Sequence, residues 1–175
     1  MKPLMILPPV IFAGLAAMFL FGMNREGADQ LESTREGGPV PALTVSAFPG
    51  EDGFTVEALA DGEVKLVNFW ASWCAPCRAE HENLMAFAEE GVPIYGINYK
   101  DAPANGRKFL DELGNPFAAV VADESGRTGL DWGLYGVPET FVVDGDGVIV
   151  KRFAGPITGS IPDTIIRPAM AEAAE

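Results

Sequence analysis

The sequence predicts an α/β fold, with a mixed central β-sheet, helices on both faces, and one N-terminal transmembrane helix ahead of it. This prediction rests on three features. Short apolar runs alternate with segments of helical periodicity, which is typical of parallel strands covered by helices. Near the C-terminus, two β-rich runs flank "DGDG", which predicts a hairpin and hence antiparallel strands. At the N-terminus, residues 3–23 contain no charged side chain.

The uncharged N-terminal run is long enough to cross a membrane as a helix. At ~1.5 Å per residue it would extend about 30 Å, the thickness of a bilayer's hydrocarbon core. Lys2 precedes the run and favours a cytoplasmic N-terminus. We therefore predict a membrane anchor at residues 1–23, in contact with the lipid bilayer. A cleaved signal peptide is the alternative, although no A-x-A-like cleavage pattern follows the run. Both interpretations place the rest of the chain where disulfides persist.

Composition separates a tether from a globular domain. Residues 24–41 are polar and rich in Gly and Glu, which predicts a tether before a domain at residues 42–175. Apolar residues make up 48% of the chain, which favours a packed core over disorder. The net charge is -13, from 12 Lys and Arg against 25 Asp and Glu, and this acidity argues against nucleic acid as a partner.

The first half of the domain is predicted to form a strand, a helix and a second strand. "EVKLVNFW" at residues 63–70 is an apolar run with β-formers next to a "DG" turn signal, so it predicts a buried strand. Residues 75–90 contain good helix formers, with apolar side chains spaced for one buried face, and Gly91 is a plausible helix stop. "VPIYGINY" at residues 92–99 predicts a second buried strand.

The second half continues the alternation and ends in the hairpin. Gly114 is placed to end the first of its helices. The expected elements are a helix at 105–113, a short strand at 117–122, a weak helix at 125–134, the hairpin at 139–155 and a closing helix at 161–173.

"WASWCAPCRAEH", residues 70–81, holds both cysteines of the chain, Cys74 and Cys77, and its only histidine, His81. A structural disulfide over so short a loop would contribute little stability. A closed zinc site needs four ligands, and the chain has no second cysteine pair. Haem attachment needs C-x-x-C-H, whereas Arg78 follows Cys77. Two thiolates could hold a copper ion, so a copper chaperone stays open.

A redox couple suits the position of the pair, where the first strand meets its helix. Cys74 would lie at the helix N-terminus, where unpaired N–H groups and the helix dipole favour the attacking thiolate. Pro76, just inside the helix, needs no N–H partner and restricts the loop. Cys77 lies one turn further and can resolve a mixed disulfide. We predict thiol–disulfide exchange through a redox-active disulfide, with no metal and no organic cofactor.

"VNFWASWCAPCR" at residues 67–78 and "YGVPETFVVD" at residues 135–144 resemble the thioredoxin superfamily. Within it, "CRAEH", "GVPET" and the N-terminal anchor resemble the membrane-anchored DsbE/CcmG group, the thiol reductants of cytochrome c maturation. The resemblance covers roughly residues 43–157 and implies a thioredoxin-like fold.

The resemblance also implies a location and partners. The protein would cross the bacterial inner membrane once, with its domain in the periplasm. It would reduce the haem-binding cysteines of apocytochrome c and be re-reduced by a membrane thiol–disulfide electron donor. Relatives such as the ResA and TlpA-type reductases share much of the pattern, so a general periplasmic disulfide reductase stays open.

The resemblance implies roles for residues around the cysteines. A cis-proline loop faces the C-x-x-C in this superfamily, and the matching residue is Pro138, after Val137. Trp73 and this loop would form the substrate-docking surface. Thioredoxins place a buried Asp where this chain has Asn68, which cannot titrate. Glu139, beside the expected cis-proline, is therefore the candidate acid in its place.

The charges near the pair bear on the direction of electron flow. Acids such as Glu80 and Glu139 disfavour a thiolate and make the couple more reducing, whereas Arg78 acts the other way. Glu80 and Glu82 are otherwise expected to be exposed helix charges, and His81 a surface or packing residue of the same helix.

Overall fold

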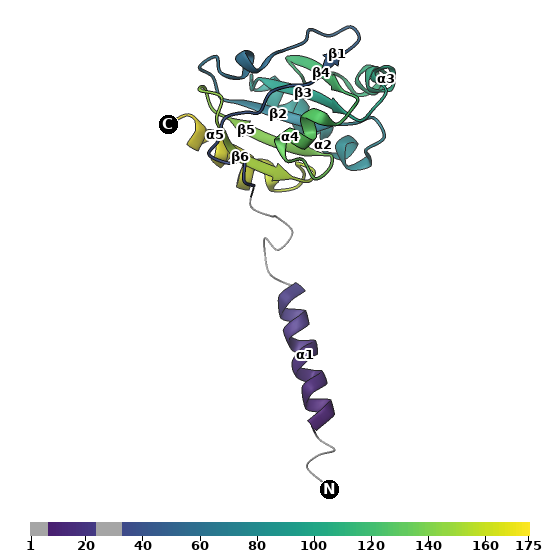
Figure 1. Ribbon diagram of the computed structural model, residues 1–175, viewed down its shortest axis with the longest axis vertical. Helices are drawn as coiled ribbons and strands as arrows, with labels where there is room; N and C mark the ends of the chain where they lie inside the picture. The colour runs from purple at the N-terminus through teal and green to yellow at the C-terminus, as the bar shows by residue number, and fades with distance from the viewer. Residues whose placement is uncertain (1–6, 24–32) are drawn as a thin grey trace. The chain divides into compact units, whose positions relative to one another are not determined.

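The computed structural model describes residues 7–23 and 33–175 (Figure 1). The chain divides into two compact units, Met1–Glu32 and Ser33–Glu175. The first contains helix α1, Leu7–Met23. No helix within the described ranges is both long and apolar enough to cross a membrane, so the predicted transmembrane helix is not supported. Residues 1–6 of the predicted anchor and residues 24–32 of the predicted tether lie outside the described residues.

The second unit is built on one six-stranded sheet in the order β1-β4-β3-β2-β5-β6 (Figure 1). Strands β2, β3 and β4 are parallel, whereas β1, β5 and β6 pair antiparallel with their neighbours. This confirms the predicted mixed sheet. The strands are β1 Ser46–Ala47, β2 Lys65–Trp70, β3 Ile94–Tyr99, β4 Ala119–Asp123, β5 Glu139–Val143 and β6 Ile149–Ala154.

Each predicted helix of this unit is present. The helices are α2 Ala75–Glu89, α3 Pro103–Leu113, α4 Arg127–Trp132 and α5 Arg167–Ala173, with the short 3-10 helix η2 at Val56–Leu59 and a π-helical turn, η3, at Pro162–Ile166. Neither η2 nor the two-residue strand β1 was predicted, because each is too short to show a hydrophobic period.

Two apolar cores cover the two faces of the sheet, because side chains alternate along each strand. On β2, Leu66 and Trp70 join α2, α3 and α5 in one core, whereas Val67 and Phe69 join η2 and α4 in the other. Every residue of β2 is buried, as expected for a central strand covered on both faces. The same alternation decides which side chains can reach α2 and the cysteines.

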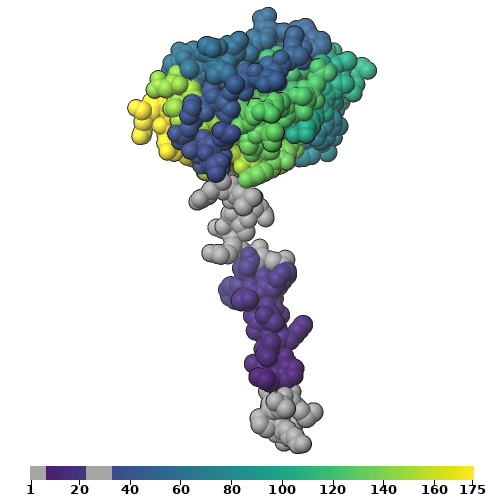
Figure 2. All heavy atoms as spheres, viewed as in Figure 1, coloured from purple at the N-terminus to yellow at the C-terminus, as the bar shows by residue number. Residues whose placement is uncertain are grey.

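The segment just before β1 lies against the outer edge of β6. The Gly37 N–H donates to the Ile149 carbonyl oxygen at 2.8 Å, and the Val40 N–H donates to the Gly147 carbonyl oxygen at 2.9 Å. Figure 2 shows this part of the chain, in dark blue, lying across the surface of the unit. The free edge of the sheet is thereby partly covered.

Candidate active site

Cys74 and Cys77 form a disulfide at the start of α2, with their Cα atoms 5.3 Å apart, so this is the oxidised form. Cys74 is the N-cap of α2, and its Sγ accepts a hydrogen bond from the Cys77 N–H at 3.1 Å. Pro76 lies in the first turn. An N-terminal N–H of the helix therefore faces the Cys74 sulfur, and after reduction such a donor would stabilise its thiolate.

The loop of Pro138 lies beside the carboxyl end of β2. The Val137–Pro138 peptide bond is cis, as the resemblance to the thioredoxin superfamily implies. Glu139 pairs with Phe69 across the β2–β5 ladder, so Pro138 lies level with the end of β2, from which the cysteine motif continues. Val137 is half-buried and packs against both cores. The structure therefore brings the predicted proline loop and the cysteine motif to the same edge of the sheet.

Trp73 is the exposed aromatic side chain of the motif. It is 59% exposed although it directly precedes a buried cysteine. Its indole Nε1–H donates to the Lys100 carbonyl oxygen at 3.1 Å, which fixes one edge of the ring. An aromatic ring presented to solvent beside the nucleophile suits a docking surface.

Glu139 lies on the opposite face of the sheet from α2, because it alternates with Thr140 along β5. Its Oε1 accepts the N–H groups of Tyr135 at 2.7 Å and Gly136 at 3.1 Å, and its Oε2 accepts Nε–H of Arg152 at 2.6 Å. The carboxylate therefore anchors the proline loop. The structure does not bring it together with Cys77, so the geometry does not support Glu139 as the acid that replaces the thioredoxin aspartate.

Glu80 is the acid on the cysteine side of the sheet. The expectation that it is exposed was wrong, because it is fully buried on α2. Its Oε1 accepts a hydrogen bond from Asn68 Nδ2 at 3.0 Å, and its Oε2 accepts the Ile157 N–H at 2.8 Å. Burial raises the pKa of Glu80 to about 7. Glu80 follows Cys77 by one helical turn on the same buried face.

Asn68 joins this acid to the proline-loop strand. Its Nδ2 donates to Glu80 and also to Thr140 Oγ1 at 3.0 Å, and Thr140 is two residues after Pro138. The side chains of α2, β2 and β5 thus form one buried polar network beneath the disulfide. The helical spacing of Cys77, Glu80, Leu84 and Phe87 was the sequence signal that could have placed Glu80 inside.

Residues 35–165 match the model of the family described as Redoxin. The chain belongs to the Redoxin family. This redoxin is 44% identical over 174 residues to the thiol:disulfide interchange protein HelX of Rhodobacter capsulatus, with 99% of each chain covered. It is 41% identical over 172 residues to DsbE of Haemophilus influenzae, covering 96% of this chain and 95% of that one.

Solved structures support the fold. A thiol:disulfide interchange protein of the thioredoxin family from Chlorobium tepidum superposes with a TM-score of 0.60 at 25% identity, covering 80% of this chain and 99% of that one. The redoxin therefore has a thioredoxin-like α/β fold. With its C-x-x-C pair at a helix N-terminus and its interchange-protein relatives, it is a thiol-disulfide oxidoreductase.

The other charged residues of α2 have structural partners or face solvent. Glu82 is exposed, as expected. His81 is buried, its Nε2 lies 3.1 Å from the Gly114 carbonyl oxygen, and its ring meets Phe109 edge-on. Burial lowers the pKa of His81. Arg78 pairs with Glu112 at 2.8 Å on the neighbouring α3. His81 is therefore a packing residue that connects α2 to the end of α3.

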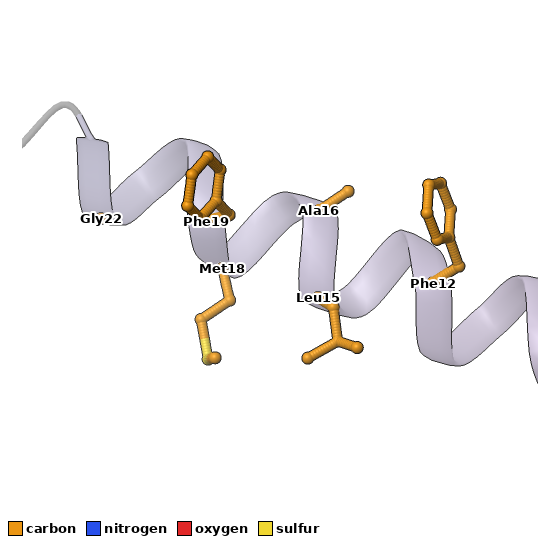
Figure 3. Close-up of a pocket in the computed structure, with 6 residues that line it drawn as sticks. All are labelled: Phe12, Leu15, Ala16, Met18, Phe19 and Gly22. Atoms are coloured by element: carbon orange, nitrogen blue, oxygen red, sulfur yellow. The ribbon is translucent and has the colours of Figure 1, made fainter.

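Other parts of the described chain offer no comparable chemistry. Within residues 7–23 and 33–175, no group of three or more His, Cys, Asp or Glu side chains is arranged to hold a metal ion. Figure 3 shows an apolar hollow on α1, whose lining has no charged, hydroxyl, thiol or imidazole side chain. Its lining residues are Phe12, Leu15, Ala16, Met18, Phe19 and Gly22.

Proposed function

We propose that this redoxin is a reductant of the bacterial periplasm that reduces the haem-binding cysteines of apocytochrome c. The observation that carries the proposal is Glu80, a buried carboxyl group one turn after Cys77 with a pKa of about 7. Its hydrogen-bond donors are a neutral amide and a backbone N–H. When ionised, such an acid disfavours a neighbouring thiolate, which makes the disulfide form the more stable one and the dithiol a reductant.

The reaction proceeds through two exchanges. The Cys74 thiolate attacks one sulfur of the substrate disulfide, which forms a mixed disulfide and releases the first substrate thiolate. The Cys77 thiolate then attacks the Cys74 sulfur, the second substrate thiolate leaves, and two electrons have passed to the substrate. The enzyme ends as the Cys74–Cys77 disulfide, the state of this structure.

Glu80 supplies the proton acceptor for the second exchange. Cys77 is only 2% exposed, so its thiol has little access to water as a base. A carboxylate with a pKa near neutrality is matched to accept the thiol proton at neutral pH. Trp73 and the Val137–Pro138 loop dock the substrate backbone around Cys74, at the edge of the sheet where both lie.

The location follows from the same proposal. The uncharged run of residues 3–23, which is longer than α1, attaches the protein to the inner membrane as a single pass and keeps residues 33–175 in the periplasm. A membrane thiol–disulfide protein returns two electrons to the Cys74–Cys77 disulfide. The named functions of HelX and DsbE relatives, thiol:disulfide interchange, support the exchange chemistry.

Substrate trapping tests the proposal. In cells that make c-type cytochromes, Cys77→Ser should accumulate a mixed disulfide between Cys74 and apocytochrome c, because the resolving thiol is missing. Cys74→Ser in the same cells is the matched control and should trap nothing. Recovery of many unrelated exported proteins, without apocytochrome c among them, would identify a general periplasmic reductase instead.

A further inference from the structure

Asp101, in the loop between β3 and α3, is buried and holds the turn that precedes the cysteine pair. Its Oδ2 accepts the Ser72 N–H at 2.8 Å, and its Oδ1 accepts the Ser72 Oγ–H at 2.9 Å. Asn98 Nδ2 donates to Oδ2 at 3.0 Å, which orients the carboxylate. Ser72 is thus bound through both its backbone and its side chain, two residues before Cys74. None of these contacts belongs to the Glu80 network.

The residue before Asp101 holds the next residue of the same turn. The Lys100 carbonyl oxygen accepts Nε1–H of Trp73, as described above. Lys100 has a φ of 45°, and within residues 7–23 and 33–175 no other residue except glycine has a positive φ. Its N–H donates to the Asp123 carbonyl oxygen at 2.9 Å. A left-handed residue other than glycine is uncommon and is often found at functional sites.

The Lys100 side chain lies against one glycine, Gly126. A Cβ atom built on Gly126 would lie 2.1 Å from Lys100 Cε, so the Lys100 side chain fills the space beside this glycine. The C-terminal ends of β3 and β4 and the N-terminus of α4 therefore meet around Lys100. The contacts of Lys100 and Asp101 converge on Ser72 and Trp73, the pair of residues that leads into Cys74.

We propose that Asp101 is a positioning residue for substrate docking: by holding Ser72, with Lys100 holding Trp73, it fixes the exposed indole where the substrate chain must bind. This inference rests on the proposed function. Trp73 presents 59% of its surface to solvent, so few packing contacts restrain it. Fixing the ring before binding removes part of the entropy that docking a polypeptide would otherwise cost. A small disulfide, which makes no use of the indole, gains nothing from this arrangement.

The experiment compares two disulfide substrates for the reduced full chain in mild detergent. One is a peptide carrying an oxidised C-x-x-C-H motif, and the other is an aromatic dithiobis compound of small size. In Asp101→Asn, which keeps the side-chain volume, we expect KM for the peptide to rise about tenfold with kcat nearly unchanged. The rate with the small disulfide should stay within about twofold of wild type, and the reduction potential should be unchanged.

Two further variants separate docking from folding. Ser72→Ala removes one donor and should raise KM for the peptide by about threefold. Asp144→Asn is the matched control, because Asp144 Oδ1 likewise accepts backbone N–H groups, those of Asp146 and Val148, in the distant hairpin turn. It should change neither KM. The fluorescence anisotropy of Trp73, read in a background without Trp70 and Trp132, should fall in Asp101→Asn.

The outcomes distinguish the two proposals. An unchanged KM for the peptide in Asp101→Asn, or an equal loss with both substrates, would overturn the positioning role. A wild-type chain that reduces the small disulfide but not the peptide rejects the proposed function. In that case the Trp73 anisotropy is the only test of the positioning role. An anisotropy in Asp101→Asn equal to that of wild type would overturn that role.

Discussion

Glu80 follows Cys77 by one turn of α2, and the two side chains lie on the same buried face of the helix. Asn68 and the Ile157 N–H donate to the Glu80 carboxylate, and neither donor carries a charge. The acid is thus held in a fixed place without a cation to stabilise its ionised form, and its pKa rises to about 7 because of burial. This arrangement couples the charge of one carboxyl group to the cysteine pair.

Glu80→Gln should make the couple less reducing. The amide keeps the size of the side chain but removes the negative charge that disfavours a thiolate, so the reduced form becomes more stable. Each pKa unit of thiolate stabilisation corresponds to about 30 mV for a two-electron couple, and we expect the potential to rise by about this amount. Equilibration of the full chain in thiol redox buffers, followed by tryptophan fluorescence, measures the change.

The control for this variant lies on the same helix. Glu82→Gln removes an equal charge from an exposed position and should leave the potential within a few mV of wild type, because solvent screens it. If both variants shifted the potential equally, the buried position of Glu80 would have no special role. A potential of Glu80→Gln equal to that of wild type would contradict the proposed direction of electron flow.

The raised pKa of Glu80 also predicts how stability depends on pH. The folded state holds the Glu80 proton up to about pH 7, whereas the unfolded chain releases it near the ordinary value of 4.5. The folded state therefore binds more protons in this window, and the free energy of unfolding falls as pH rises from 4.5 to 7. The loss is at most about 3–4 kcal/mol, from the difference between 4.5 and about 7 at ~1.4 kcal/mol per pKa unit.

Denaturant unfolding of the oxidised protein at several pH values measures this slope. His81 acts in the opposite sense, because its lowered pKa makes the folded state gain stability as pH rises toward 6.5. Glu80 is therefore isolated by subtracting the curve of Glu80→Gln from that of wild type. A difference curve that is flat between pH 4.5 and 7 would show that Glu80 has an ordinary pKa in the folded protein.

The mixed sheet and the cysteine motif could be predicted because their signals are local. An apolar run of six residues, a helix with a capping cysteine and a "DGDG" turn each occupy one short stretch. The burial of Glu80 was harder to predict from the sequence, because its hydrogen-bond donors belong to Asn68 and Ile157, which are distant in sequence. The partner of Glu139 posed the same difficulty, because Arg152 meets it across a β ladder.

Gly96 offers a prediction about the core beneath the site. A Cβ atom at Gly96 would lie 2.8 Å from Phe117 Cγ, and the Phe117 ring stacks on Trp70 with centroids 5.5 Å apart. Gly96→Ala should force the ring aside and cost about 1–3 kcal/mol of stability, with a shift in tryptophan emission. Gly53→Ala is the control, because its nearest neighbour would be Val121 at 3.8 Å. Equal stability of both variants would show that Phe117 yields without cost.

Glu139→Gln should lower the stability of the folded protein but leave its reduction potential nearly unchanged. Its side chain and that of Arg152 are 2% and 3% exposed and form an ion pair at 2.6 Å. Removing the carboxylate charge leaves the guanidinium buried without its counter-charge, which typically costs about 3–5 kcal/mol. Because Glu139 lies on the sheet face opposite α2, the reduction potential should change far less than in Glu80→Gln.

Denaturant unfolding and redox equilibration of the same Glu139→Gln sample test both parts of this prediction. A potential shift as large as that of Glu80→Gln, with little loss of stability, would return Glu139 to the role of the acid that serves Cys77.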